Sequence, residues 1–350
     1  MGCRDRVYHK MAGDAGGNES HGPVTEGMRQ LVTSAISDAV LALLRCPVCG
    51  DILAAGDGCL RCVSFRCGCR FPVMDGIPVL INEHQSVFTI DDFTQRRNTT
   101  LDLHRNRLER TCARLLPRVS ANLTGRRNYQ RLVTLLLQQS ASPRVLVVGG
   151  SILGEGMEVM VRAKSIELVE TDVSFGPRTM LICDAHSLPF DDASFDGVVA
   201  QAVLEHVADP VQCVEEFHRV LKENGLVYAE TPFMVPVHMG RYDFTRFTHL
   251  GHRRLFRRYD EIDSGVVCGP GAALAWCYQQ FLLSFTSSRA CRAVIKAFAR
   301  ITSFYLKYFD WLLLHKPSAL DGAAGFYFLG RKTDRQLSDR ELLSMYRGAG

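Results

Sequence analysis

Six cysteines crowd into a short stretch near the N-terminus, and their spacing is typical of a metal site. Cys46-Pro-Val-Cys49-Gly50 has the two-residue gap of a zinc knuckle, in which two thiolates converge on one ion. A second pair of cysteines must complete the tetrahedron, and four cysteines are candidates for it: Cys59, Cys62, Cys67 and Cys69. A site with four thiolate ligands has no open position for chemistry, so we expect a structural Zn²⁺.

A second group of residues has the pattern of a nucleotide site. The apolar run Val145–Val148 leads directly into a glycine-rich turn that contains Gly149, Gly150, Ser151 and Gly154. Glycines are needed there because the backbone must turn sharply and let a nucleotide approach closely. This turn also comes near to the dinucleotide-binding fingerprint, so taken alone it does not identify the ligand.

Carboxylates at the ends of the next two predicted strands indicate which class of ligand the site binds. Asp172 ends the second strand, where it can accept hydrogen bonds from both hydroxyls of a ribose. Asp184 ends the third strand and can accept one from an exocyclic adenine amine; Ala185 and His186 follow it. Together these two carboxylates predict a site for an adenosine-containing cofactor.

Polar and aromatic residues after the fourth and fifth strands are the candidates for substrate contact, because ligands of open α/β sheets bind beyond the carboxyl ends of the strands. We expect His238 or His206 to act as a general base. The predicted substrate-contacting residues are Glu205, Phe233, Tyr242 and Asp243, the last two orienting the base. The alternative is that Glu205 and His206 are scaffolding and that Asp243 pairs with Arg246 to hold the loop.

Alternating strand and helix patterns must position these residues. From residue 144 onward, short β-branched runs are separated by helical periodicity, which indicates a parallel sheet covered on both faces. The predicted strands are Val145–Val148, Ile166–Val169, Met180–Cys183, Gly197–Ala200, Leu226–Glu230, Ile262–Val267 and Gly325–Leu329. Helices are also predicted at 101–116 and 129–138.

The ordered motifs of residues 144–233 resemble class I S-adenosylmethionine-dependent methyltransferases. They include Cys183–Phe190, Gln201-Ala-Val-Leu-Glu205-His206-Val207 and Gly225-Leu-Val-Tyr. The resemblance implies a Rossmann-like α/β fold with a seven-stranded, mostly parallel sheet. It also implies S-adenosyl-L-methionine as cofactor, with contacts at Gly149, Gly150, Asp172, Asp184, Ala185 and Gln201. Val147 and Ser151 depart from the pattern, since the family often has an acid and a glycine there.

Two further segments carry resemblances of their own. The run ETPF…YDFTRFT from Glu230 to Thr248 is similar to a bacterial subgroup of type 11-like methyltransferases. The run CPVCGDIL…CRFPVMDGIPVLI resembles the zinc ribbon of methyltransferase activators, here fused to the enzyme. That second resemblance implies Cys62 and Cys67 as the partners of Cys46 and Cys49.

Composition sets the domain plan. With 350 residues, 47% hydrophobic and 22% charged, the chain is globular, and its net charge of +4 does not indicate a nucleic-acid partner. The first residues lack the apolar core of a signal peptide, so we expect a cytoplasmic protein. The expected units are a disordered tail (1–25), a leading helix (26–44), the zinc ribbon (45–83), a linker with helices (84–128), the methyltransferase domain (129–335, with a helical insertion at 270–318) and a C-terminal tail (336–350).

The helical insertion has a wide apolar arc and a basic stripe across 272–314. Apolar helices are usually buried, so we expect this pair to pack on the sheet. The alternatives are a lid over an apolar substrate, a homodimer contact, or a peripheral contact with a membrane.

The resulting functional prediction is S-adenosylmethionine-dependent methyl transfer to an oxygen or nitrogen of an unidentified acceptor. A nucleotide-dependent oxidoreductase is one alternative, although Ser151 interrupts the fingerprint that would hold a pyrophosphate. The other alternative is a non-catalytic, methyltransferase-like partner protein whose altered turn no longer holds the cofactor.

Overall fold

The structure is a computed structural model that describes residues 23–100 and 116–350. Nearly all of the helix predicted at 101–116, and most of the tail predicted at 1–25, lie outside the described residues.

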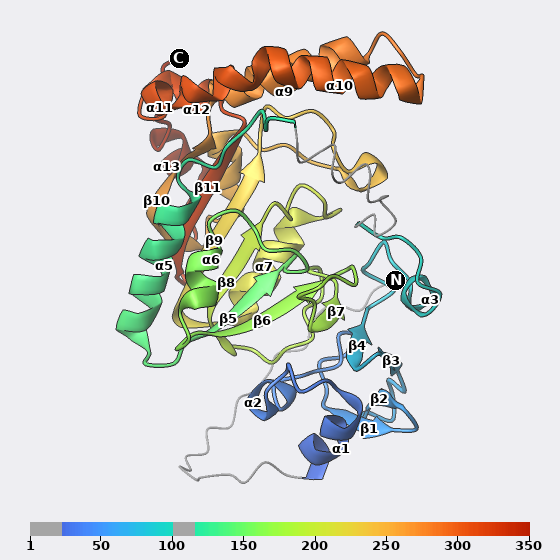
Figure 1. The fold of residues 1–350 in the computed structure, drawn as a ribbon. Coiled ribbons are helices and arrows are strands. Elements are labelled where there is room, and N and C mark those ends of the chain that lie inside the picture. Colours follow the sequence, from blue (N-terminus) through green and yellow to red (C-terminus); the bar gives the residue numbers. More distant parts are fainter. Residues whose placement is uncertain (1–22, 101–115) are drawn as a thin grey trace, which may run out of the picture.

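One mixed sheet runs through the whole molecule, in the order β1-β2-β3-β4-β7-β6-β5-β8-β9-β11-β10 (Figure 1). From β4 to β9 all neighbouring strands are parallel, whereas β11 runs antiparallel between β9 and β10. The strands that carry the predicted motifs are β5 (Arg144–Val148), β6 (Glu167–Asp172), β7 (Leu181–Cys183), β8 (Phe195–Gln201), β9 (Leu221–Pro232), β10 (Tyr259–Cys268) and β11 (Gly325–Lys332).

The sheet is larger than predicted, because eleven strands pair continuously instead of seven. The four additional strands come from the cysteine-rich segment, and the last of them pairs in parallel with β7 through Val79 and Ile182, and through Leu80 and Cys183. Sequence patterns did not indicate this pairing, since both strands are very short. They are β1 (Leu53–Gly56), β2 (Cys59–Cys62), β3 (Arg70–Met74) and β4 (Ile77–Leu80).

Helices cover both faces of the sheet, as the uninterrupted apolar strands predicted. Along β5, Val145 and Val147 face a core that includes Tyr129 of helix α5 (Gly125–Gln139), whereas Leu146 and Val148 face the core on the other side. Phe217 of α7 (Pro210–Val220) lies in that second core. Two shorter helices follow the same layering: α6 (Glu158–Arg162) and α8 (His249–Leu255).

The leading helix predicted at 26–44 is divided in two. Helix α1 (Pro23–Leu31) ends early, and α2 (Asp38–Leu41) starts anew at Ser37, whose hydroxyl accepts a hydrogen bond from the Val40 amide at 3.2 Å. Serine favours such a cap because its side chain satisfies an amide that the helix leaves unpaired. Apolar residues at helical spacing, Met28, Val32, Ile36 and Val40, are still buried, although the chain bends between the two helices.

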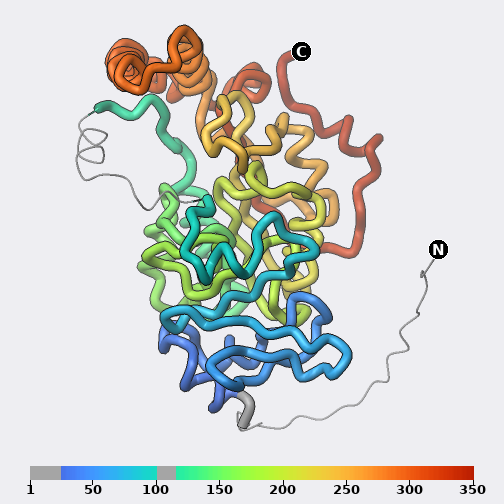
Figure 2. Tube along the Cα trace, turned by 90° about the vertical axis from the view of Figure 1, so that its right-hand side faces the viewer, coloured from blue at the N-terminus to red at the C-terminus, as the bar shows by residue number. Residues whose placement is uncertain are grey.

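The helical insertion lies at the end of the molecule opposite the cysteine-rich strands (Figures 1 and 2). Its two main helices are α9 (Pro270–Leu283) and α10 (Arg289–Ser303), followed by η2 (Phe304–Tyr308), α11 (Asp310–Leu313) and α12 (Pro317–Gly322). Buried Ala272 and Ala273 pack against Ala324 at the sheet. Among the described residues, no helix is both long and apolar enough to cross a bilayer.

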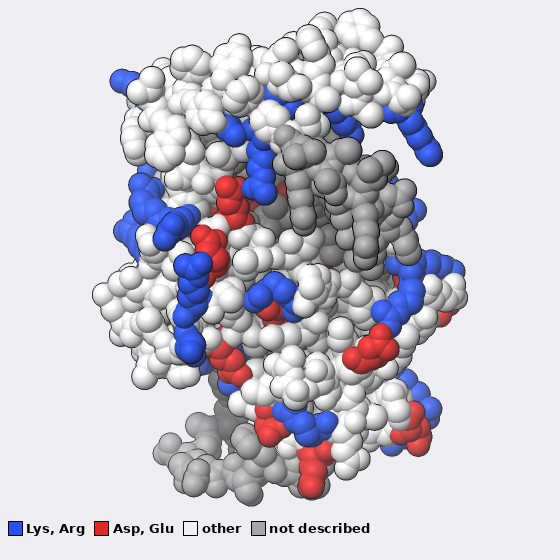
Figure 3. Space-filling view, viewed as in Figure 1, with Lys and Arg blue, Asp and Glu red and all other residues white. Residues whose placement is uncertain are grey.

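The prediction that this helix pair is buried on the sheet is wrong for its outer surface. Large apolar side chains there face solvent, and in Figure 3 the outer side of this end is largely white, with Lys and Arg along its lower edge and at its ends. We call these residues the apolar face: Leu274, Phe281, Phe285, Val294, Phe298, Ile301, Tyr305, Phe309, Trp311 and Leu312. The helices pack on each other and on the sheet through their small residues, which leaves the large ones outside.

Candidate functional site

A cavity of about 470 Å³ opens at the carboxyl ends of β5 to β8. It lies at the point where the strand order reverses between β5 and β8, which is where open α/β sheets bind their ligands. The predicted cofactor-binding residues in its wall are Gly149, Ser151, Gly154, Asp172, Asp184, Ala185, His186 and Gln201. Gly150 lies in the turn beside them but is not part of the wall.

Two glycines of the turn are required by close contacts. Gly149 has a φ of +72°, and a Cβ atom there would lie 2.5 Å from the Val203 side chain. A Cβ atom on Gly154 would lie 1.7 Å from Oε1 of Gln201. Any side chain at either position would therefore displace the wall of the cavity.

Asp172 is buried at the end of β6 and faces the cavity. Its Oδ2 accepts a hydrogen bond from the Ser151 amide at 3.1 Å, so Ser151 contributes to the site through its backbone. Burial raises the pKa of Asp172 above its usual value. The other departure from the family pattern, Val147, lies in the core and has no contact with the cavity.

Asp184 is oriented by three donors. Its Oδ1 accepts from the His186 amide at 3.0 Å and from His186 Nδ1 at 2.5 Å, and its Oδ2 accepts from the Ser86 hydroxyl. Nε2 of His186 accepts from the Asp209 amide, which fixes Nδ1 as the protonated nitrogen. Although burial raises the pKa of Asp184, the hydrogen bonds from His186 and Ser86 outweigh it and lower the pKa.

Gln201 is held in a buried network below the cavity. Its Oε1 accepts from the Tyr129 hydroxyl at 3.1 Å, and its Nε2 donates to Glu230 at 2.9 Å. Glu230 also accepts from Asn122 at 2.9 Å and from the Tyr228 hydroxyl, and its burial raises its pKa. The amide of Gln201 thus positions the floor of the cavity, in addition to the ligand contact predicted for it.

A second cavity of about 230 Å³ adjoins the first, and Ala202 and Glu230 belong to the walls of both. Its lining is mostly apolar and includes Val235, Val267, Ala324 and Trp276 of the helical insertion. Glu205 and His238 lie in this wall, whereas His206 lies in the wall of the first cavity. The predicted catalytic histidines therefore stand at the junction of the two cavities.

Glu205, His206 and His238 come together at this junction. His206 Nε2 lies 3.6 Å from a carboxylate oxygen of Glu205, and the two imidazole rings are 4.9 Å apart, edge to face. Glu205 is completely buried, and neither of its oxygens has a hydrogen-bond partner. Burial raises its pKa to about 8, and burial lowers the pKa of both histidines.

The loop after β9 orients the two histidines. The Tyr242 carbonyl accepts from His206 Nδ1 at 2.8 Å, and Asp243 accepts from the His238 amide at 2.8 Å. Asp243 also pairs with Arg246, as the structural alternative predicted, and this pairing outweighs burial and lowers the pKa of Asp243. Tyr242 and Asp243 thus orient the two histidines through hydrogen bonds.

Among the predicted substrate-contacting residues, neither Tyr242 nor Asp243 lines a cavity, and neither does Phe233. Its ring stacks on Phe326 at 5.6 Å in a small apolar cluster below α12, and it lines neither cavity. The residue follows the end of β9, as the sequence indicated, but its backbone pairs with the Ala324 carbonyl, which directs the side chain into the cluster.

Some residues of the site were missed. Ser86, which donates to Asp184, precedes Val87 and Phe88 of the cavity wall; all three lie in the segment that we expected to be a linker. The apolar pair Val87-Phe88 in a polar stretch was the only sign of them in the sequence. Ala202 was also missed: it has a positive φ of +55°, an uncommon backbone conformation for a residue with a side chain, and it turns the chain from β8 toward Glu205.

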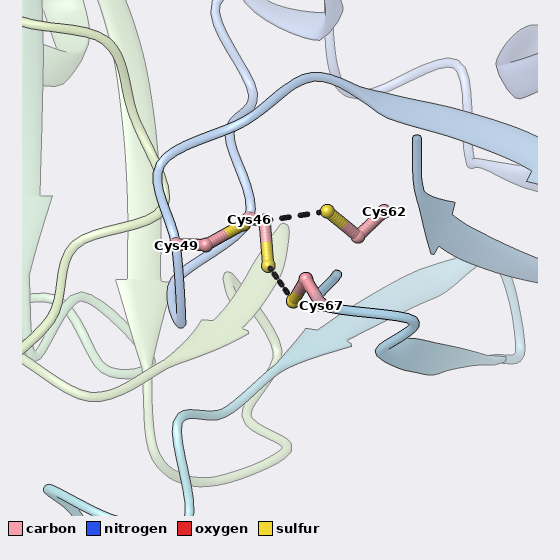
Figure 4. A group of neighbouring side chains, drawn as sticks. All are labelled: Cys46, Cys49, Cys62 and Cys67. Atoms are coloured by element: carbon pink, nitrogen blue, oxygen red, sulfur yellow. Dashed lines mark hydrogen bonds between the residues drawn. The ribbon is translucent and has the colours of Figure 1, made fainter. Parts of the chain in front are cut away.

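The structure brings together four of the six clustered cysteines: Cys46, Cys49, Cys62 and Cys67 (Figure 4). The sulfur atoms of Cys46 and Cys67 lie 3.7 Å apart, and those of Cys49 and Cys62 lie 3.4 Å apart. A tetrahedral Zn²⁺ with bonds of about 2.3 Å places its sulfur ligands about 3.8 Å apart, so this donor set fits the ion. Cys59 instead donates to the Gly56 carbonyl.

Comparison with known proteins gives one family match, to the methyltransferase domain, over residues 155–229. A 37.1 kDa protein of transposon TN4556 from Streptomyces fradiae is 34% identical over 101 residues, which are 29% of this chain and 26% of that protein. Demethylmenaquinone methyltransferase of Staphylococcus epidermidis is 50% identical over 44 residues, 13% of this chain and 18% of the enzyme. The chain thus spans about a quarter or less of the length of these curated relatives.

Among solved structures, the chain is similar to 1,6-didemethyltoxoflavin-N1-methyltransferase of Burkholderia thailandensis with bound S-adenosylhomocysteine. The two share 13% identity, with a TM-score of 0.35, over 59% of this chain and 78% of that one.

Proposed function

We propose that this protein transfers a methyl group from S-adenosyl-L-methionine to an oxygen or nitrogen of an acceptor bound in the second cavity. One observation carries the proposal. The residues that match the methyltransferase domain begin in the wall of the first cavity and extend through β8 into β9. They bring two carboxylates, Asp172 and Asp184, to one site with the dimensions of a nucleoside ligand.

The residues of the first cavity fit the cofactor. Asp172 would accept from the ribose hydroxyls, and Asp184, already oriented by Ser86 and His186, retains lone pairs for the adenine amine. When bound, the cofactor supplies an electrophilic methyl group. The remaining task of the protein is to align the acceptor with the methyl group for in-line displacement. Such alignment can by itself lower the activation barrier substantially.

The lining of the second cavity supports one class of acceptor. Its apolar wall suits a largely apolar molecule, whereas Glu205 and His238 suit a hydroxyl or amine at one end of it. Burial lowers the pKa of His206 and of His238, which favours the neutral imidazole that can accept a proton from the acceptor. The helical insertion closes this cavity with Trp276.

We assign the cysteine-rich segment a structural role, with Zn²⁺ held by Cys46, Cys49, Cys62 and Cys67. Support comes from the strands on either side of the site. They end in β4, which pairs with β7, and the loop after β4 supplies Ser86 to Asp184. The ion therefore braces the wall of the cofactor cavity from a distance.

Isothermal titration calorimetry of the full chain tests the proposal. We expect binding of both S-adenosyl-L-methionine and S-adenosylhomocysteine, and no binding of NAD or NADP. Binding of a nicotinamide cofactor alone would favour the oxidoreductase instead. Binding of none of the four would favour the non-catalytic partner protein and overturn the enzymatic proposal.

A further inference from the structure

The junction of the two cavities has the composition of a metal site. One ligand atom each from Glu205, His206 and His238 lies within 4.8 Å of the other two. Two imidazoles and one carboxylate are a known ligand set for Zn²⁺ at sites that keep one position open. With bonds of about 2.1 Å, a bound ion would draw these atoms to roughly 3.4 Å from one another, which side-chain rotation can provide.

The hydrogen bonding of His206 leaves the lone pair of Nε2 available to bind a metal ion. Its Nδ1 lies 2.8 Å from the Tyr242 carbonyl, which can only accept, so Nδ1 carries the proton. The lone pair is then on Nε2, which faces Glu205 at 3.6 Å. A ligating histidine nearly always donates its other ring proton to a carbonyl or carboxylate, because this fixes the ring and increases its basicity.

Nδ1 of His238 likewise has hydrogen-bond acceptors nearby. Its Nδ1 lies 3.3 Å from Asp243 and 3.4 Å from the Pro236 carbonyl. Arg246 Nη2 also lies 3.3 Å from Nδ1, but this guanidinium makes a shorter bond of 2.8 Å to Asp243. Asp243 is thus placed to accept the Nδ1 proton of His238, as a carboxylate accepts the proton of the non-ligating nitrogen in many zinc sites.

Glu205 is the second, independent observation. A buried carboxyl group normally has hydrogen-bond partners, because leaving it without any is costly. Both oxygens of Glu205 lack one although the side chain is completely buried in the cavity wall. A cation between the carboxylate and the two imidazoles would supply the missing partner.

We propose that Glu205, His206 and His238 bind a divalent transition-metal ion of the Zn²⁺ type, with an open position toward the second cavity. Binding of the ion does not depend on the proposed function. Its use in methyl transfer does: an ion bound here would take a hydroxyl of the acceptor as its fourth ligand and lower the pKa of that hydroxyl, so that its proton leaves to solvent. The oxygen would then bond to the methyl carbon as the carbon–sulfur bond breaks and S-adenosylhomocysteine leaves. The two histidines would then act as ligands in place of a general base.

Metal content of the full chain tests this site. The protein is saturated with Zn²⁺, desalted and analysed by mass spectrometry, as wild type and as Glu205→Gln, His238→Ala and His315→Gln. We expect two ions per chain for wild type and for His315→Gln, which removes an exposed histidine elsewhere. We expect one ion, that of the cysteines, for the other two variants. His238 is partly exposed, so its variant keeps the test valid if Glu205→Gln does not fold.

Cobalt distinguishes the two sites by spectrum. Co²⁺ at the cysteine site gives thiolate charge-transfer absorption, whereas Co²⁺ at the proposed site gives only weaker d–d bands, which Glu205→Gln should abolish. Equal metal content in wild type and Glu205→Gln, or one ion in wild type, would overturn the proposal. Neither result would affect the calorimetric test of cofactor binding.

Discussion

At the scale of single residues, Asp172 is the sharpest test of the cofactor cavity. Its carboxylate is buried at the end of β6, and Ser151 fixes one of its oxygens. In Asp172→Asn the amide keeps one acceptor but loses the charge. Since a hydrogen bond to a charged group contributes roughly 1.5–3 kcal/mol, we expect calorimetry to show S-adenosyl-L-methionine binding weakened about 10- to 100-fold.

Asp260→Asn is the matched control for this experiment. Asp260 is an exposed carboxylate on β10 that lines neither cavity. Its variant should bind like wild type. An Asp172→Asn variant that also binds like wild type would remove Asp172 from the cofactor site.

His252 makes the stability of the fold depend on pH. Its side chain is buried between Phe247 and Phe256, and burial, with repulsion by His249 and Arg253, lowers its pKa to about 3. The unfolded chain takes up a proton near pH 6.5, whereas the folded chain does not. The unfolding free energy should therefore fall as pH decreases below 6.5, by about 2 kcal/mol at pH 5.

Chemical denaturation at pH 5 and pH 7.5 measures this difference. In His252→Leu the contribution of this residue disappears, so the loss between the two pH values should be about 2 kcal/mol smaller than in wild type. An identical loss in both proteins would mean that His252 is protonated in the folded state.

The sequence predicted well which residues at the ends of the parallel strands reach the first cavity. Asp172, Asp184 and Gln201 all reach one cavity because parallel strands bring their carboxyl ends to the same edge. It failed for Phe233, whose direction depends on one backbone hydrogen bond to Ala324. It also missed Ser86, because a contact that spans almost a hundred residues has no local pattern.

At the scale of elements, the helical insertion makes the strongest prediction. Between Ser264 and Asp310 the chain has no acidic residue. The basic residues in this segment are Arg289, Arg292, Lys296, Arg300 and Lys307. On α10 these basic residues lie on the side of the helix opposite its exposed apolar residues, which is the arrangement of a basic amphipathic helix that binds anionic lipid. We propose that α9 and α10 lie on an anionic membrane surface, from which an apolar acceptor could enter past Trp276.

Vesicle flotation tests this role. The full chain should float with vesicles of phosphatidylcholine and phosphatidylserine, less so as salt is raised, and not with phosphatidylcholine alone. Phe281→Asp/Phe298→Asp should abolish flotation. Leu343→Asp, an equally exposed apolar position on α13 (Asp339–Ser344), should not. Absence of flotation in wild type, or a dimer that only the double variant dissociates, would overturn this role.

Element types were predicted better than element limits. Strands from β5 to β11 were found because buried strands have continuous apolar runs. The helix predicted at 26–44 was divided because its apolar residues keep their spacing across a bend, and periodicity alone does not detect the cap at Ser37. The prediction that α9 and α10 pack on the sheet holds for small residues such as Ala272 and Ala273 but is wrong for their large apolar residues, because periodicity does not show which part of an apolar arc is covered.

At the scale of the whole molecule, the cysteine site and the cofactor cavity should be coupled. The ribbon ends in β4, which forms the neighbour of β7, and Ser86 then reaches Asp184. Loss of the ion should therefore loosen both. In Cys49→Ser we expect faster amide hydrogen exchange in β7 and weaker cofactor binding, by about tenfold, since one charged hydrogen bond is lost.

Cys59→Ser is the control, because this cysteine is close in sequence but lies outside the group of four sulfur atoms. Its exchange and binding should match wild type. If Cys49→Ser and Cys59→Ser behave alike, the ribbon and the cavity are independent.

The pairing of β4 with β7 has a consequence for how the chain is made. Val79 pairs with Ile182, so β4 leaves the ribosome about a hundred residues before its partner. At 5–20 residues per second the interval is roughly 5–20 s. The edge of β4 that pairs with β7 therefore stays without its partner strand for that interval, and the shared core of the cysteine-rich segment and the sheet is completed only after β7 has been synthesised.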